Sequence, residues 1–289
     1  RILVATDFSA AGECAVAAGA RWARREHAAL RLLHVAPSRR LVGGALGSRR
    51  VALELATAAK GALADVAARA DPERTLELST ALVTGAASRE IARAAVEFDT
   101  DLVVIGVRGE HAHGAPGLGG TAAKLVDRFE RPLLLARSEA AGSAPPVVIA
   151  GVDLGPASRA VIGWGLRAAA GGTLHVVHVY ELPYAGRLAA YGFSDAALGV
   201  YSEREQAERE RALAALLVPA AGAADVCVEH VVERGRAASL LAAHRARRHA
   251  GTIVVGRHRR GARSPAGFAS VCRDVAQFAS CDVLVVPSS

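Results

Sequence analysis

The residues best suited to hold a ligand lie in the stretch GVRGEHAHGAPGLGGT, which begins at Gly106 and directly follows the apolar run DLVVI. Six of its sixteen residues are glycine, and Gly106 and Gly109 would let backbone approach a ligand closely. Gly119, Gly120 and Thr121 would open the next helix, whose free N–H groups and positive dipole end suit a phosphate. The stretch therefore either cradles a phosphate or forms a flexible surface loop.

Asp7, at the end of the opening run RILVATD, is the nearest candidate for further ligand chemistry. A carboxylate does not attract a bare phosphate, but it could accept hydrogen bonds from a ribose hydroxyl or help to hold Mg²⁺. The glycine-rich stretch is neither GxxxxGK[ST] nor a GxGxxG after the first strand, which argues against a P-loop NTPase and a dinucleotide-binding domain. His111 and His113 could bind a metal, but no third ligand is near in sequence, so we expect a solvated loop and no metal site.

Apolar runs alternate with helical patterns through the first half of the chain. Ser9 and Ser88 are the expected N-caps of the first and third helices. Such alternation predicts a parallel sheet with right-handed crossovers, and the wholly apolar runs VVIG and LLLA predict a sheet covered on both faces. The expected strands are 1–7, 29–37, 75–85, 101–106 and 131–137, and the expected helices are 11–27, 50–70, 88–98 and 121–129.

These elements would position the candidate residues at one edge of the sheet. Ligands of open parallel sheets bind beyond the carboxyl ends of the strands, where the strand order reverses. The segment 5–7, the pair His34 and Val35, and the glycine-rich loop would converge there. We expect His34 to make a hydrogen bond across this point.

The same unit begins again at residue 147. VVIAGVD matches RILVATD with Asp153 in the place of Asp7, and His178 takes the place of His34. The offset is 146 at the aspartate pair and 150 at the pair Gly106 and Gly256, which indicates tandem duplication. We therefore expect an α/β fold of two tandem five-stranded parallel-sheet domains, at 1–137 and 147–289, joined by a linker at 138–146.

The second copy departs from the first where a ligand would bind. Arg259 stands in the place of the second glycine and Ala269 in the place of the third, so this copy is expected to be a structural partner. An Arg-rich loop there could still hold another anion. Ser202 and Glu205 predict a capping box at the start of its long helix, and the Tyr-rich stretch before it could be a flap, an interface or an ordinary loop.

The pattern G-x2-G-x9-G after DLVVIG resembles the signature of the universal stress protein family, and VATDFS and LLHV resemble its first two strands. The resemblance covers both copies. It implies pairing through the last strand, which in a tandem chain can join the two copies, and a homodimer is a further expectation. It also implies ATP, with or without Mg²⁺, held at Ala5, Thr6, Asp7, Val35, Ile105, Gly106, Arg108, Gly109, Gly119, Gly120, Thr121 and Ala122. Gly120 and Ala122 depart from the family pattern, which has hydroxyl side chains there.

Composition adds limits to this interpretation. The chain has 289 residues, 52% of them hydrophobic, and a net charge of +7. The runs RARRH and RHRRGAR could touch nucleic acid, but no aromatic residues interleave with them, so solvated surface is the favoured interpretation. No apolar run is long enough to span a bilayer, and four cysteines without metal-ligand spacing indicate buried thiols in a reducing cytoplasm.

No catalytic constellation emerges from the sequence. The residues and the resemblance together predict a cytoplasmic stress-response protein that binds an adenine nucleotide in its first domain as a sensor or regulator. Two alternatives stay open, which are an interaction scaffold that binds no nucleotide and a protein that slowly hydrolyses ATP or phosphorylates itself.

Overall fold

The chain folds into two compact units. The computed structural model describes residues 1–37, 49–109, 117–137, 145–182, 191, 194–219, 225–257 and 268–288. One unit comprises Arg1–Ala140 and Ala276–Val285, and the other comprises Ala141–Val275 and Val286–Ser289. The first unit therefore contains most of the last strand of the second sequence repeat.

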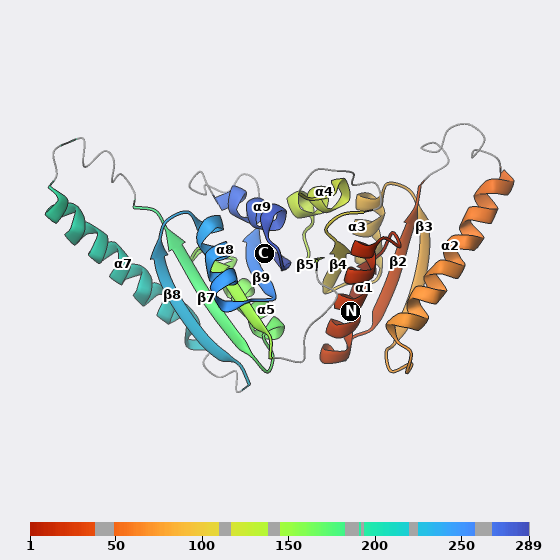
Figure 1. Ribbon diagram of the computed structural model, residues 1–289, viewed down its shortest axis with the longest axis horizontal. Coiled ribbons are helices and arrows are strands. Elements are labelled where there is room, and N and C mark those ends of the chain that lie inside the picture. The colour runs from red at the N-terminus through yellow and green to blue at the C-terminus, as the bar shows by residue number, and fades with distance from the viewer. Residues whose placement is uncertain are drawn as a thin grey trace. The chain divides into compact units, whose positions relative to one another are not determined.

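The first repeat forms five parallel strands in the order β3-β2-β1-β4-β5, and β10 (Asp282–Pro287) continues this sheet antiparallel to β5. Helices α1 and α2 contact each other, as do α3 and α4, and right-handed crossovers place one pair on each face. In Figure 1, α2 runs alongside β3. The elements are β1 Ile2–Ala5, α1 Ala10–Glu26, β2 Leu30–Ala36, α2 Arg49–Ala70, β3 Leu78–Thr84, α3 Ala87–Glu97, β4 Leu102–Gly106, α4 Gly120–Arg128 and β5 Leu133–Ala136.

The second repeat follows the same plan. Within its unit the strand order is β9-β6-β7-β8, and every pair with a described register is parallel. This architecture confirms the predicted α/β class and the tandem duplication. The elements are β6 Val147–Val152, α5 Ser158–Ala168, β7 Thr173–Tyr180, α7 Asp195–Leu217, β8 Cys227–Arg234, α8 Ala237–Arg248, β9 Thr252–Arg257 and α9 Phe268–Phe278.

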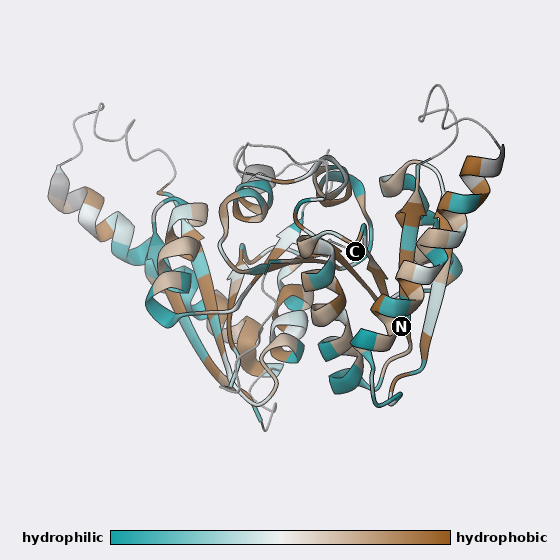
Figure 2. Cartoon of the chain, turned by 45° about the vertical axis from the view of Figure 1, so that its right-hand side comes forward, coloured by the Kyte–Doolittle hydropathy of each residue, from teal (hydrophilic) through white to brown (hydrophobic). Residues whose placement is uncertain are grey.

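The core of each sheet consists of its central strands. Leu3, Val4, Val103 and Val104 are each 0% exposed, because helices cover both faces of β1 and β4. Figure 2 shows these central strands as hydrophobic, while the covering helices carry hydrophilic residues on their outer sides. Burial of such apolar surface is the main favourable term in folding.

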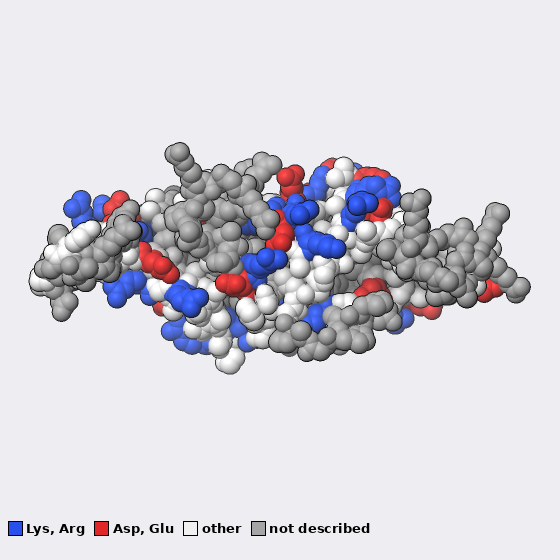
Figure 3. All heavy atoms as spheres, turned by 90° about the horizontal axis from the view of Figure 1, so that it is seen from above, with Lys and Arg blue, Asp and Glu red and all other residues white. Residues whose placement is uncertain are grey.

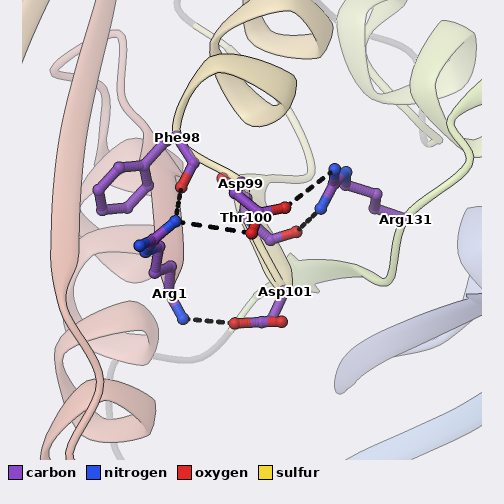
Figure 4. Close-up of polar contacts among 6 residues, drawn as sticks. All are labelled: Arg1, Phe98, Asp99, Thr100, Asp101 and Arg131. Atoms are coloured by element: carbon purple, nitrogen blue, oxygen red, sulfur yellow. Dashed lines mark hydrogen bonds and ion pairs between the residues drawn. The ribbon is translucent and has the colours of Figure 1, made fainter.

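The amino ends of β4 and β5 are joined by polar contacts, as Figure 4 shows. Arg131, just before β5, donates to the carbonyl oxygen of Thr100 at 2.5 Å and pairs with the carboxylate of Asp99 at 3.5 Å. Asp99 adopts a left-handed backbone with φ of 49° in the turn from α3. These contacts fix the strand ends opposite to the predicted ligand edge.

Several predicted boundaries need correction. Ser9 does cap α1 and accepts from the backbone N–H of Gly12 at 3.2 Å. Ser88 is not a cap, because α3 begins one residue earlier after Ala86. The third strand begins at Leu78 and not at Thr75, because the carboxylate of Asp71 accepts from the backbone N–H groups of Thr75 and Leu76 and turns the chain there.

The predicted capping box on the long helix of the second repeat is also wrong. Helix α7 begins at Asp195, so Ser202 and Glu205 lie inside it, and Glu205 instead accepts from Arg209 one turn later. Of the four cysteines, all free thiols, Cys227 is exposed and not buried as expected. Among the described residues, no helix combines the length and apolar character needed to cross a membrane.

Candidate functional site

The carboxyl ends of β1 and β4 bring the predicted site residues together. These two strands are neighbours, and Ala5 on β1 lies in register with Ile105 on β4. The strand order places the first crossovers to one side of β1 and the later ones to the other side of β4, so this is the switch point of the sheet. Val35 lies one strand away on β2.

One oxygen of the Asp7 carboxylate is hydrogen-bonded where β1 passes into α1. This oxygen, Oδ1, accepts from the backbone N–H of Ser9 at 3.2 Å and from its hydroxyl at 2.5 Å. Ser9 in turn caps α1, so the start of the helix and the orientation of this carboxylate depend on each other.

The second carboxylate oxygen of Asp7 faces the glycine-rich loop. A Cβ atom built on Gly109 would lie 2.4 Å from Oδ2 of Asp7, closer than real Cβ contacts allow. Two segments about a hundred residues apart therefore meet here because residue 109 has no side chain. The backbone of Gly109, which carries no side chain, lies beside the carboxylate of Asp7.

Thr6 serves the scaffold of the site. Its side chain is 5% exposed, and its hydroxyl accepts from the backbone N–H of Phe8 at 3.1 Å. Its carbonyl oxygen accepts from Nδ1 of His34 at 2.8 Å, which confirms the predicted hydrogen bond between the ends of β1 and β2. His178 repeats this bond with the carbonyl oxygen of Val152 at 2.9 Å.

Phe8 is a neighbour of the site that the sequence analysis missed. Its ring stacks on His34 with centroids 4.3 Å apart, and its φ of 65° is in the left-handed region. The signal available in the sequence was its place between Asp7 and Ser9, the two residues that end β1 and begin α1. The stacked pair joins the turn after β1 to the end of β2.

Gly106 has a packing role. A Cβ atom at this position would lie 2.5 Å from the backbone carbonyl oxygen of Ala11 on α1. The helix can sit this close to the end of β4 only because residue 106 has no side chain. The sequence predicts a ligand role for this glycine, and the packing of α1 accounts for it independently.

The described ends of the loop meet each other. The N–H of Gly119 donates to the carbonyl oxygen of Val107 at 2.8 Å, and Nε of Arg108 donates to the carbonyl oxygen of Gly117 at 2.9 Å. Arg108 is exposed, and its side chain joins the two described ends of this loop. Residues 110–116, with His111 and His113, lie outside the described residues.

The amino end of α4 is suited to an anion. Gly119 is its N-cap and provides no side-chain hydrogen bond, so the first N–H groups of the helix have no side-chain cap. Gly120 is exposed, with no atom within 4 Å of an added Cβ, whereas Ala122 is 2% exposed in the core. A hydroxyl at position 122 would therefore be buried.

Arg137, which follows β5, is a second basic residue that the sequence analysis did not single out. Its guanidinium donates to the carbonyl oxygens of Cys281 and Ala276, and its backbone N–H donates to Asp282 at 2.8 Å. Burial lowers the pKa of Arg137, and Cys281 and Asp282 oppose this effect. The side chain is committed to anchoring β5 and β10.

The second repeat has a small apolar cavity at the corresponding edge. It has a volume of about 40 Å³, and Asp153 at its rim accepts from Gly155 N at 2.9 Å and from the Ser158 hydroxyl at 3.0 Å. Small-molecule pockets measure roughly 300–1,000 Å³. Its other lining residues are Gly151, Val152, Ala157, Val161, Val177, Val179, Ala237, Leu241, Val255, Gly256 and Val271. Arg259 lies outside the described residues.

Among the described residues, neither metal-ligating side chains nor clustered charges indicate a second ligand site. Within the described ranges no group of three or more His, Cys, Asp or Glu residues could hold a metal ion. On the face drawn in Figure 3, acidic side chains lie among the basic ones. On α3, Arg93 pairs with both Glu90 and Glu97 at 2.9 Å.

Comparison with known proteins gives a consistent family and fold. The sequence model described as the universal stress protein family matches residues 1–137 and 146–287. A universal stress protein from Archaeoglobus fulgidus is 18% identical over 100% of this chain and 98% of its own, with a TM-score of 0.69. A functionally unknown protein from Pseudomonas aeruginosa is 18% identical over 99% of this chain and 92% of its own, with a TM-score of 0.67. Among proteins with curated functions, none matches this sequence.

Proposed function

Because the chain belongs to the universal stress protein family, with one copy in each half, we propose that its first half binds an adenine nucleotide. The nucleotide would be ATP, and binding would serve a stress response as a sensor or regulator. The observation that carries this proposal is the approach of Asp7 to Gly109 beside the uncapped amino end of α4. This arrangement places the carboxylate of Asp7, an acceptor for ribose hydroxyls, beside backbone N–H groups that can donate to phosphate.

The proposed ligand residues follow from this arrangement. Ala5, Thr6, Asp7 and Val35 would surround adenine and ribose, with Thr6 acting through its backbone because its hydroxyl is engaged. Ile105, Gly106, Arg108 and Gly109 would line the ribose and phosphates. The phosphates would lie at Gly119, Gly120, Thr121 and Ala122, where backbone N–H groups are the donors. Ala122 would contribute its backbone alone, because its side chain is in the core.

Magnesium is compatible with this site but would depend on the nucleotide. Asp7 offers one carboxylate, whose Oδ1 already accepts two hydrogen bonds from Ser9. Mg²⁺ in nucleotide sites is usually bound by one or two carboxylates together with phosphate oxygens and water. Asp7 would therefore be the protein ligand, and Mg²⁺ would neutralise phosphate charge.

An interaction scaffold without nucleotide is the second candidate function. Gly120 and Ala122 carry no hydroxyl, which favours it. The loss of two such hydrogen bonds, at about 1 kcal/mol each, would weaken binding up to about thirtyfold. In either case the second repeat serves as a structural partner, because its cavity is small and apolar. We expect the two repeats to pair within the chain, and a homodimer is a further expectation.

Titration calorimetry with Mg-ATP tests the proposal. Wild type is compared with Gly109→Arg, which copies Arg259 of the second repeat, and with Gly61→Arg as a control. Gly61 lies on α2 with no atom within 4 Å of an added Cβ, so the control adds the same charge without a clash. At Gly109 the clash is with the end of a flexible side chain, so Asp7 should move and the fold should persist.

Binding by wild type and Gly61→Arg, weakened at least about tenfold in Gly109→Arg, is the expected result. Equal binding by all three proteins would place the nucleotide elsewhere. No binding by wild type up to millimolar ATP would favour the scaffold. Phosphate release, measured on the same samples, distinguishes binding from slow hydrolysis.

A further inference from the structure

Two buried histidines join β7 to α8 in the second repeat. His175 is 4% exposed and His244 is 5% exposed, and Nε2 of His175 lies 3.1 Å from Nδ1 of His244. Glutamates lie at both ends of the pair. Nδ1 of His175 is 3.5 Å from Glu229, and Nε2 of His244 is 3.2 Å from Glu233. The four side chains form a continuous line from β8 through β7 and α8 back to β8.

The pair can be fully bonded only while one of its two facing nitrogens lacks a proton. With both rings neutral, one ring donates and the other accepts at the 3.1 Å contact. With one added proton, both outer nitrogens carry hydrogen near the two glutamates and the contact between the rings survives, but Nε2 of His244 can then no longer accept from Arg247. With a second added proton, two N–H donors face each other, and the contact cannot form.

We propose that the His175–His244 pair is a proton-controlled contact that holds α8 on the sheet of the second repeat and releases it in mild acid. The proposal concerns the second repeat and does not depend on nucleotide binding in the first. It gives this repeat a regulatory role in addition to a structural one.

Burial and the charged surroundings of His175 favour its neutral form. Arg248 lies 2.5 Å from Glu229, and Arg247 lies 3.8 Å from Glu233 and 3.2 Å from Nε2 of His244. These arginines neutralise the glutamates that would otherwise stabilise an imidazolium. Burial is the main cause that lowers the pKa of His175, followed by the charges of Arg248 and His244, and Glu229 opposes them. On the other side, β6 presents Ile149, which does not titrate.

The first repeat lacks this device at every corresponding position. Arg31 stands in the place of His175, Ser79 in the place of Glu229, and Ala94 in the place of His244. The first repeat packs α3 through apolar residues such as Ile91 and Ala94. We therefore expect the packing of α8 to depend on pH and the packing of α3 not to.

Release of α8 would also open the cavity of the second repeat. Leu241 lies one turn before His244 on the same helix and lines that cavity together with Val177 and Val179 of β7. Leu241 is tightly seated, because a Cβ atom on Gly151 would lie 2.9 Å from it. Movement of α8 would remove one wall of the cavity, so protonation would expose apolar surface.

Hydrogen exchange of backbone amides in the full chain tests the proposal. Protection factors for α8 and α3 are compared at about pH 7.5 and about pH 5.5, after correction for intrinsic exchange rates. We expect protection of α8 to fall about tenfold or more in acid, while α3 changes by less than about twofold. Constant protection of α8 would overturn the proposal.

Variants separate the pair from other histidines. A double variant, His175→Leu with His244→Leu, fills the same space without titrating and should remove most of the response of α8 to pH, leaving at most the part that His178 causes. It retains the buried His178, so an unchanged response would assign the effect elsewhere and overturn the proposal. His230→Leu, at an exposed position on β8, should respond as wild type does.

A second measurement applies if the double variant does not fold. Imidazole nitrogen shifts of the wild type report the proton positions on His175 and His244. The proposal requires that loss of α8 protection follows the titration of this pair. Titration of both rings with unchanged α8 protection would overturn it.

Discussion

The Oδ2 atom of Asp7 lies 2.4 Å from the position that a Cβ atom would occupy on Gly109. The contact joins the end of β1 to the loop after β4, and no residue other than glycine fits at position 109 without moving the carboxylate. It also separates two roles of Asp7, because Oδ1 serves the start of α1 and Oδ2 faces the loop. These two roles can be tested independently.

Asp7→Asn should weaken Mg-ATP binding by roughly tenfold to a hundredfold, since a hydrogen bond to a charged group contributes about 1.5–3 kcal/mol. The asparagine oxygen can still accept from Ser9, so the start of α1 should persist. Calorimetry and a urea melt measure the two effects. The control is Asp153→Asn, which changes the matching aspartate of the second repeat and should leave ATP binding unchanged. Equal affinities for wild type and Asp7→Asn would show that Asp7 serves only the turn between β1 and α1 and does not contact the nucleotide.

Gly120→Ser should tighten Mg-ATP binding by roughly threefold to tenfold, the equivalent of one added hydrogen bond. The new side chain meets no atom within 4 Å and places a hydroxyl at the first residue of α4. Gly163→Ser is the matched control, because this position on α5 is equally open. A gain in the control as large as in Gly120→Ser would show that the hydroxyl does not act on the phosphate.

Much of the scaffold could be predicted because its signals are local. Apolar runs locate β1, β4 and β5, and Ser9 indicates the start of α1 by its side-chain oxygen alone. The repeat of His34 as His178 indicates a shared bond, and both histidines do bond to the carbonyl oxygen at the end of the neighbouring strand. The apolar runs and the cap depend on residues that are close in sequence, and the shared bond was indicated by the repeat itself.

Other features depend on distances between remote segments, which a sequence does not contain. The closeness of Ala11 to Gly106 gives that glycine a packing role, and the stacking of Phe8 on His34 needs the register of β1 and β2. The turn made by Asp71 makes the third strand begin at Leu78, three residues later than its alternating pattern predicted. The ligand roles of the site residues stay predictions.

His178 should make the second repeat sensitive to acid. Burial lowers the pKa of His178, and its hydrogen bond to Val152 opposes this effect only in part. Below about pH 6.5, the ordinary pKa of histidine, the unfolded chain binds the proton more readily than the folded chain. The free energy of unfolding should therefore be highest above this pH and fall as the pH drops through the lowered pKa of the folded state.

His178→Phe tests this cause. The variant loses the hydrogen bond to Val152, so it should be less stable than wild type by roughly 0.5–1.5 kcal/mol near pH 8. It should also lose less stability in acid, so the two urea-melt curves should converge as the pH falls. Parallel curves would show that His178 does not cause the acid sensitivity.

Gly106→Ala should destabilise the first repeat by roughly 1–3 kcal/mol, the usual cost of overpacking a core. The added methyl would meet the backbone carbonyl oxygen of Ala11 at 2.5 Å, and backbone cannot rotate away as a side chain can. In Gly256→Ala, the matched change, the methyl meets only side-chain atoms of Ala157 at 3.2 Å and Val161 at 3.4 Å, so a smaller loss is expected. Urea denaturation of both variants without nucleotide measures the difference. If Gly106→Ala were as stable as wild type and yet bound ATP poorly, the packing explanation for this glycine would be wrong and its role would lie with the ligand.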